Sequence, residues 1–455
     1  MASPSPDAPP DDHAVPHPLP DHDERPTLCD LPFDVFFELL NYVSATEITF
    51  LLSTCRTLHR YVHQVSIWQR LCARYGLRTT HGRSFFTTYT QLLHPYGPLL
   101  GIWASDHPYY GNIVEFRLLP DDQNAPGGIV GEVWRFPTRQ FDGKAPSFPE
   151  YSRVLNISFS SDSPLPGANE ECATPVVTSV CCGAPNPARI TKDNTDIPLH
   201  SASIEIVSPS PHAYFLQEYR RTYMHPEFPA EAADWYDTER ELPHVPKSTI
   251  AIQDQRQLVN IYPAVRLPLI FTSITARTKP AAISIRCHVA GCESLQMPLP
   301  FDDMITAPPR YYPLRRDTQE GIDPDDAEWS LQSLTGLWLG DYGRSGTECL
   351  HVTWRQDLDE LRAYKLTGDA HVPRGVCTWT VMSQPAEMSS AALQNSHAVA
   401  RAFRGVGTIS LRGFPAATAV ELVVGIVGAN EIRIWWDQVN DWRTYVRYTG
   451  RDHIS

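Results

Sequence analysis

Apolar residues recur at helical spacing near the start of the chain. The stretch LPFDVFFELLNYV carries the i, i+3, i+4, i+7 pattern at Phe33, Phe36, Phe37 and Leu40. SATEITFLLSTC predicts a second helix, and RTLHRYVHQVSIWQRLCARYG predicts a third that ends at Gly76. Three short helices in residues 28–78 carry more apolar surface than they can bury among themselves, which predicts a module that binds a partner.

From residue 97 onward the pattern changes to short runs in which apolar and polar residues alternate. RVLNISFS, ECLHVTWR, ELRAYKLTG and AVELVVGIV are examples, and about a dozen such runs follow one another. Alternation predicts antiparallel strands with one buried face, and the number of strands favours a sandwich or a closed barrel. The predicted fold class is α+β: three N-terminal helices (28–78), a linker helix (79–96) and one large antiparallel β-barrel (97–452).

Several segments interrupt the strand pattern. Insertions are predicted near 160–200 and 380–400, and a helical interruption is predicted in 210–243. A Gly-x-Trp pattern occurs twice, in GIWASDHPYYGN at 101–112 and in GLWLGDYGRSG at 336–346. An indole flanked by apolar residues usually seals a β core, so Trp103 and Trp338 are predicted core residues. The two copies are either equivalent strands of one barrel wall or a chance likeness of two strand starts.

Composition excludes several classes of function. The net charge is −14 over 455 residues and no run of Lys and Arg stands out, which argues against nucleic-acid binding. Residues 1–27 are rich in Pro and Asp and are predicted to be disordered. We expect no membrane contact, because neither a signal peptide nor an apolar run of membrane-spanning length is present. Ten cysteines fit reduced thiols and a location in the cytoplasm, the nucleus or both.

No catalytic constellation is evident. The chain lacks Gly-x-Ser-x-Gly, a Walker-type loop and His-Glu-x-x-His. We therefore predict no catalytic residues and a chain that is not an enzyme.

The N-terminal helices resemble an F-box. Leu31-Pro32, Cys55-Arg56 and Ile67-Trp68 stand where the F-box pattern has Leu-Pro, Cys-Arg and an apolar-Trp pair, with Asp34 in place of the usual Glu. The resemblance implies that these helices bind the Skp1-type adaptor of a cullin-RING ubiquitin ligase. The predicted adaptor-binding residues are Leu31, Pro32, Phe36, Leu39, Val43, Ile48, Leu51 and Trp68. The alternative is a helical cap that packs on the β domain.

The remainder of the chain resembles the F-box only protein 31 family. Besides the two Gly-x-Trp stretches, residues 365–375 (KLTGDAHVPRG) are similar to the family's Lys-Ile-Thr-Gly-Asp-Pro-Asn-Ile-Pro-Ala-Gly. The resemblance implies a β-barrel that receives the degrons of protein substrates, described for this family as C-terminal ends that include amides. It also implies a role as substrate-recognition subunit of an SCF (Skp1-cullin-F-box) ubiquitin ligase, without catalysis by this chain.

The same segment suggests a substrate site. Asp369 follows a Gly in a predicted turn, where its carboxylate could accept hydrogen bonds from a terminal amide and repel a terminal carboxylate. We hypothesise a terminus-reading pocket formed by Tyr342, Glu348, Lys365, Thr367 and Asp369. The alternative is that Asp369 only closes its own turn.

The family carries a zinc site of two Cys and two His, which this chain does not reproduce. His200 fits one ligand position and Cys172, Cys181 and Cys182 lie upstream, but the expected downstream Cys and His pair is missing. Tetrahedral zinc needs four such ligands. We therefore expect neither a metal nor another cofactor. The alternative function is a lipocalin-like barrel that binds a small apolar ligand, because lipocalins also open with Gly-x-Trp.

Overall fold

The structure is a computed structural model. It describes residues 27–43, 45–80, 83–105, 111–119, 127–136, 146–159, 175–180, 199–206, 280, 282–287, 310–314, 321–342, 346–369, 371–372, 374, 377–386, 399–409 and 418–451. The predicted disordered tail (apart from Thr27), the helical interruption at 210–243 and most of the two insertions lie outside the described residues. The chain divides at Gln64 into two compact units.

The first unit holds the predicted N-terminal helices. These are α1 (Phe33–Leu39), α2 (Ala45–Ser53) and α3 (Arg56–His59), with 3-10 turns at Leu28–Asp30, Leu40–Tyr42 and Arg60–His63. Phe36, Leu40 and Leu58 are buried. The ring of Tyr61 lies 4.9 Å from that of Phe33 and 5.2 Å from that of Phe36. An aromatic cluster therefore holds α1 against the turn that follows α3.

The predicted third helix is interrupted. Gln64 has an extended backbone (φ −78°, ψ 109°), so the segment divides into α3 with its 3-10 turn and a separate helix, α4 (Val65–Ala73). The single long helix of the sequence prediction is therefore wrong. The residues around Gln64 (His63 to Ser66) carry no Gly or Pro that would have signalled the break.

In the second unit, α4 packs on the segment predicted as a linker helix. That segment is helical as α5 (Phe85–Thr87), a π-helical turn (Thr88–Leu93) and α6 (His94–Tyr96). Trp68 contacts Phe86 edge-to-face at 4.9 Å and lies 5.8 Å from Tyr89. Among the described residues, no helix is both long and apolar enough to cross a membrane.

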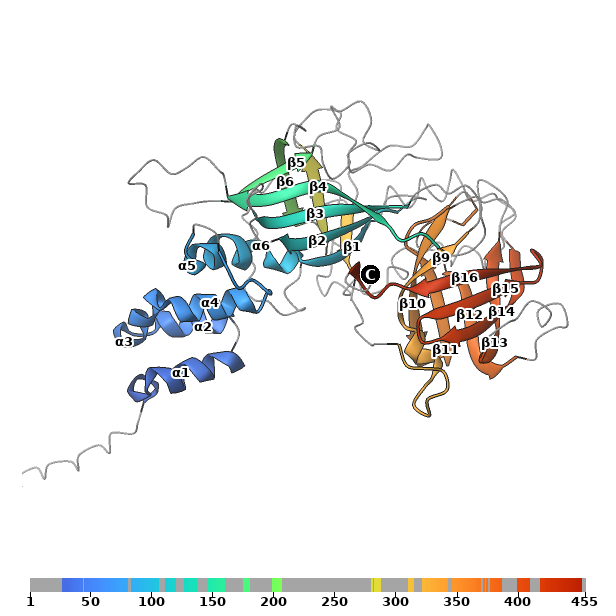
Figure 1. Ribbon diagram of the computed structural model, residues 1–455, viewed down its shortest axis with the longest axis horizontal. Helices are drawn as coiled ribbons and strands as arrows, with labels where there is room; N and C mark the ends of the chain where they lie inside the picture. The colour runs from blue at the N-terminus through green and yellow to red at the C-terminus, as the bar shows by residue number, and fades with distance from the viewer. Residues whose placement is uncertain are drawn as a thin grey trace, which may run out of the picture. The chain divides into compact units, whose positions relative to one another are not determined.

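Sixteen described strands form two closed antiparallel barrels (Figure 1). The first comprises β1 (Gly101–Ser105), β2 (Ile113–Leu119), β3 (Gly128–Arg135), β4 (Glu150–Phe159), β5 (Pro175–Val180), β6 (Leu199–Ile206), β7 (Ile283–Cys287) and β8 (Arg310–Pro313). The second comprises β9 (Gly336–Asp341), β10 (Thr347–Arg355), β11 (Glu360–Lys365), β12 (Cys377–Pro385), β13 (Arg401–Ile409), β14 (Thr418–Gly428), β15 (Glu431–Trp436) and β16 (Asp441–Arg447).

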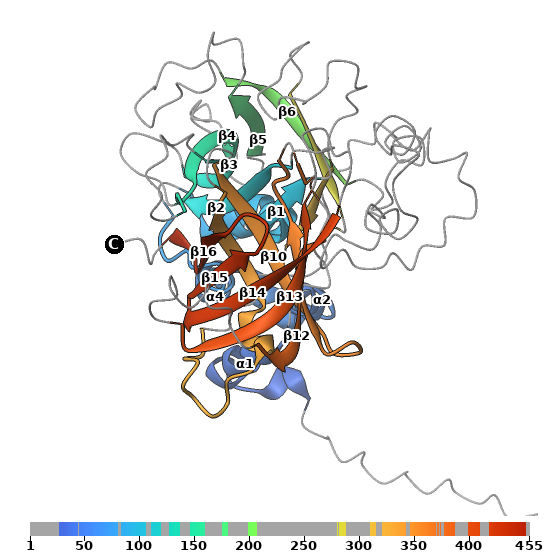
Figure 2. The ribbon, with the colours of Figure 1, turned by 90° about the vertical axis from the view of Figure 1, so that its right-hand side faces the viewer.

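The prediction of antiparallel strands after N-terminal helices is confirmed, but the single large barrel is corrected to two. In each barrel the first strand pairs with the last: β1 with β8, and β9 with β16. Alternation identifies a strand and its buried face, whereas the partner of a barrel's first strand lies far along the chain. The hydrophobic pattern therefore could not indicate where one barrel closes and the next begins. Figure 2 shows β12, β13 and β14 side by side in the second barrel.

The two Gly-x-Trp stretches open the two barrels in the same way. Trp103 and Trp338 are both fully buried, each in the core of its own barrel. A short 3-10 turn precedes each strand, and the indole N–H donates to a carbonyl four residues earlier: Leu99 at 2.6 Å in one, Leu334 at 2.8 Å in the other. The preceding glycines have φ of 114° and 134°. Only glycine adopts such angles readily, which explains the Gly of the motif.

The likeness extends to the strand register. Two residues beyond each Trp, Ser105 pairs with Tyr311 of β8 and Gly340 pairs with Tyr445 of β16. Both tyrosines are fully buried. The copies are therefore equivalent first strands of two similar barrels, rather than two strands of one barrel wall.

The indole hydrogen bonds provide a test of this account. We expect Trp338→Phe to lower the free energy of unfolding by about 1–3 kcal/mol, because the Leu334 carbonyl loses its donor in a buried site. Urea unfolding measures the change. Trp442→Phe, at a half-buried position, is the control and should cost under about 1 kcal/mol. Equal losses in the two variants would contradict the structural role of the Trp338 N–H.

The outer faces of the opening strands share a third apolar cluster. It contains Ile102 and Ala104 of β1 together with Leu337 and Leu339 of β9. Nearby, the Arg451 guanidinium donates to Glu115 of β2 at 2.9 Å. It also pairs with Glu132 of β3 at 2.6 Å. The chain that leaves the second barrel is thus tied to the outside of the first.

Candidate functional site

A charged cluster lies within the second barrel at the end where β11 finishes. Lys365 is the last residue of β11 and follows the buried Leu361 and Ala363 at two-residue spacing. By the same alternation, Glu348 precedes the core residues Leu350 and Val352 on β10. Both charged side chains therefore point into the barrel. We call Tyr342, Glu348, Lys365, Asp369 and Tyr445 the Lys365 cluster.

Lys365 is the centre of the cluster. Its side chain is fully buried, and its Nζ donates to an Asp369 carboxylate oxygen and lies 2.8 Å from Glu348 Oε2. The ammonium also sits over the Tyr342 ring, 4.4 Å from its centroid. Tyr445 donates its hydroxyl to Glu348 Oε1 at 2.6 Å. One buried cation thus holds two carboxylates and one aromatic face.

Asp369 also closes the turn that contains it. One carboxylate oxygen accepts from the backbone N–H groups of His371 at 2.6 Å and Val372 at 2.7 Å, while the other accepts from Lys365. Thr367 Oγ1 accepts from the N–H of Cys349 on β10 at 2.8 Å. The turn is therefore fixed to the barrel through side chains, and both oxygens of Asp369 are engaged.

A glycine makes room for the tyrosine of the cluster. Gly340 pairs with Tyr445 across β9 and β16, and a Cβ added at Gly340 would lie 2.0 Å from the tyrosine ring. The Tyr445 hydroxyl reaches Glu348 because its ring passes over this glycine. Tyr445 was not identified as a site residue from the sequence. Its only signal is the alternation of the last strand, which cannot show that it faces Glu348, 97 positions earlier.

The charges in the cluster support one another. Burial alone would lower the pKa of Lys365, but the attraction of Asp369 and Glu348 outweighs it and raises that pKa. Burial would raise the pKa of Asp369, but Lys365 and the two backbone donors hold it below its usual value. Burial raises the pKa of Tyr342 to about 12. At neutral pH the cluster therefore contains a Lys cation and an ionised Asp369.

These shifts predict the pH dependence of stability. The contribution of Asp369 is complete above its unfolded pKa of 3.8 and is lost as the pH falls through the lower folded value. The contribution of Lys365 is complete below 10.5 and is lost only as the pH rises through the higher folded value. The stability difference between the wild type and Asp369→Asn should be constant from about pH 5 to about pH 9 and shrink below about pH 4. Urea unfolding across this range measures it; a difference that grows in acid would contradict the ion pairing.

The predicted adaptor-binding residues fall into three groups by burial. Phe36, Ile48 and Trp68 are buried. Pro32 and Leu39 are exposed, and Leu31, Val43 and Leu51 are partly buried. The structure also exposes large apolar side chains that sequence reasoning did not select: Val35, Tyr42, Phe50 and Val65. The period of a helix identifies an apolar face but not which of its residues remain uncovered.

The predicted loss of a zinc site stays a prediction. Cys172, Cys181 and Cys182 and the side chain of His200 lie outside what the structure describes. Within the described part of the chain, no group of three or more His, Cys, Asp or Glu side chains is placed to hold a metal ion.

Comparison with known proteins supports the resemblance found in the sequence. The family model described as "Cyclin D1 binding domain" matches residues 319–447, which include the whole second barrel and the Lys365 cluster. F-box only protein 31 of Rattus norvegicus and of Homo sapiens are each 32% identical over 97 residues, 20% of this chain and 19% and 18% of theirs. F-box only protein 31-B of Xenopus laevis is 31% identical over 96 residues, 19% of this chain and 18% of its own. The chain thus matches about a fifth of the length of these curated relatives, and its similarity to F-box only protein 31 is confirmed.

Proposed function

We propose that this relative of F-box only protein 31 is the substrate-recognition subunit of an SCF ubiquitin ligase. Its N-terminal helices would bind a Skp1-type adaptor and, through it, a cullin, while the second barrel would bind the degron of a protein substrate. The observation that carries the proposal is the match of the whole second barrel to a cyclin D1 binding domain. The chain itself would be non-catalytic and would contribute proximity between the substrate and the ubiquitin-charged enzyme.

The exposed apolar residues of the first unit support the adaptor half of the proposal. Val35 and Leu39 on α1, Tyr42 after it and Phe50 on α2 expose between 42% and 87% of their surface. Large apolar side chains gathered on a small helical unit mark a protein-binding surface. We call these four residues the exposed apolar set. Leu39 was predicted from the sequence, and the other three extend the predicted adaptor contacts.

Second-barrel packing bears on the alternative function. Side chains including Trp338, Trp379 and Phe403 form a continuous buried core within the barrel. A lipocalin-like protein holds its ligand in the middle of the barrel, whereas the middle of this barrel is occupied by these side chains. The specific observations therefore favour a protein-binding barrel.

The Lys365 cluster supports a preference among peptide ends. One lysine and two carboxylates give the cluster a formal charge of −1 when all three are ionised. A terminal amide could donate its NH2 group to Glu348 or Asp369 and accept from Lys365, whereas a terminal carboxylate would meet net repulsion. Because both Asp369 oxygens already have partners, the peptide end would have to share or displace them.

A matched pair of peptides tests this preference. Two peptides of one sequence, ending in an amide and in a carboxylate, would be titrated against the wild type and Asp369→Asn by fluorescence anisotropy. We expect the wild type to favour the amide at least about tenfold, because one unpaired like charge costs that much or more. The preference should diminish in Asp369→Asn, which removes one negative charge. An unchanged preference in the variant would exclude Asp369 from end recognition.

A further inference from the structure

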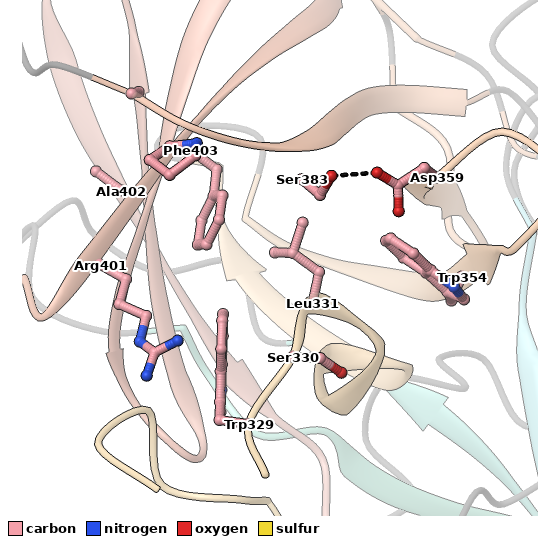
Figure 3. Close-up of a pocket in the computed structure, with 11 residues that line it drawn as sticks. Trp329, Ser330, Leu331, Trp354, Asp359, Ser383, Arg401, Ala402 and Phe403 are labelled. Atoms are coloured by element: carbon pink, nitrogen blue, oxygen red, sulfur yellow. Dashed lines mark hydrogen bonds between the residues drawn. The ribbon is translucent and has the colours of Figure 1, made fainter. Parts of the chain in front are cut away.

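The second barrel has a pocket at the end opposite to the Lys365 cluster. Asp359 directly precedes β11 and lines this pocket, whereas Lys365 is the last residue of the same strand. The first and last residues of β11 are separated by about 17 Å in an extended strand. The pocket has a volume of about 530 Å³, within the range of ordinary ligand sites. Figure 3 shows its lining.

Three aromatic rings are part of the pocket wall. Trp329 stacks on Phe403 with ring centroids 5.8 Å apart, and Trp354 lines the other side. Leu331, from the 3-10 turn (Leu331–Leu334) that precedes β9, lies between them (Figure 3). The indole N–H of Trp329 is buried and has no hydrogen-bond partner among the described residues. The pocket therefore offers mainly apolar surface.

The two charged side chains at the pocket differ in what they already bind. The Asp359 carboxylate accepts from the Ser383 hydroxyl. The Arg401 guanidinium lies over the Trp329 ring at 4.6 Å and forms no ion pair with any described residue. A guanidinium held over an aromatic ring beside an apolar pocket suits a ligand that carries an anionic group next to an apolar group.

The barrel wall is irregular beside the pocket. Val381 of β12 pairs with Gly405 of β13, but the next pair is Pro385 with Phe403. Three residues of β12, 382–384, therefore face Arg404 alone, so most of their backbone groups cannot pair with β13. All three are exposed. The irregularity lies in the wall of a closed barrel, where residue 382 still pairs with Glu360 of β11, and it exposes the side chains of this stretch beside the pocket.

We propose that this pocket is a second peptide-binding site, which takes a large aromatic side chain followed by an acidic residue. The aromatic ring would pack against Leu331, Trp354 and Phe403 in the pocket, and the carboxylate would pair with Arg401. The site goes beyond the proposed end recognition, because it lies at the other end of the barrel and reads an internal sequence. Occupying both would let one substrate contact two ends of the second barrel.

Three octapeptides that end in a free carboxylate, which the Lys365 cluster is expected to disfavour, test the proposal with the full chain. Each has Gly and Ser flanks and a fluorescein label, and the central pair is Phe-Glu, Phe-Gln or Ala-Glu. We expect saturable binding of the Phe-Glu peptide in fluorescence anisotropy, and at least about tenfold weaker binding of the other two. Arg401→Gln should weaken the Phe-Glu peptide by a similar factor. Arg404→Gln is the matched control, because Arg404 is an exposed arginine on the same strand, and it should bind like the wild type.

Asp369→Asn separates this proposal from end recognition. Binding of the Phe-Glu peptide should be unchanged in that variant, and a loss there would place the peptide at the Lys365 cluster and overturn the proposal. Equal affinity for Phe-Glu and Phe-Gln, or equal effects of Arg401→Gln and Arg404→Gln, would also overturn it. The proposal would also be overturned if the Phe-Glu peptide shows no saturable binding up to about 100 µM. Indole-3-acetate serves as the competitor. If it displaces the Phe-Glu peptide when both are at the same concentration, the pocket would be assigned to a small aromatic acid instead of a peptide.

Discussion

Replacing Lys365 with methionine is expected to lower the free energy of unfolding by about 3–5 kcal/mol. The substitution keeps most of the volume of the side chain but leaves Glu348 and Asp369 as buried carboxylates without their cation. Removing one partner of a buried pair costs far more than the pair contributes, because the remaining charge is neither solvated nor paired. Urea or thermal unfolding of the purified chain measures the loss.

Two further variants make this result specific. Arg355 pairs with Asp357 at 2.9 Å, but both side chains are largely exposed, so Arg355→Met should cost less than about 1 kcal/mol. Adding Glu348→Gln and Asp369→Asn to Lys365→Met removes the unpaired charges and should recover part of the lost stability. If Lys365→Met is no more harmful than Arg355→Met, the Lys365 cluster is not the buried network described above.

The substitution Leu39→Arg is expected to weaken binding to a Skp1-type adaptor at least about 30-fold, the loss typical of a hot-spot residue. Leu39 exposes 42% of its surface on α1. An arginine there can remain solvated in the free chain, so the unfolding temperature should stay unchanged while the apolar contact is lost. Titration calorimetry with purified adaptor measures the affinity.

Val406→Arg is the matched control. Val406 is exposed to a similar extent, 45%, but lies on β13 of the second barrel. The adaptor should bind this variant as it binds the wild type. If both arginine variants weaken binding equally, the effect is general and the assignment of the adaptor surface to α1 is wrong.

Local patterns in the sequence predicted local structure well. The spacing of Phe33, Phe36 and Phe37 predicted α1, and alternation predicted strands where β10 and β11 lie, although β10 is buried on both faces from Glu348 to Val352. The Gly-x-Trp stretches were predicted to place their indoles in a core, and both do. These features depend only on residues close in sequence, which is why they could be read without a structure.

Features that depend on distant residues were not predicted. The closure of the first barrel needs β8 to meet β1, which lies more than 200 positions earlier, and the site needs Tyr445 to meet Glu348. The resemblance brought Lys365 and Asp369 to attention, but only the structure shows that they bind each other. The hydrogen bonds from the N–H groups of His371 and Val372 show that Asp369 closes its turn, which the sequence had left as one of two alternatives.

Complex formation between this chain and a purified Skp1-type adaptor tests the central proposal most directly. Size-exclusion chromatography with light scattering, followed by calorimetry, would give the stoichiometry and the affinity. The account predicts a 1:1 complex with a dissociation constant below about 1 µM, which Leu31→Ala combined with Pro32→Ala abolishes. No complex at tens of micromolar, or one that survives the double substitution unchanged, would contradict it.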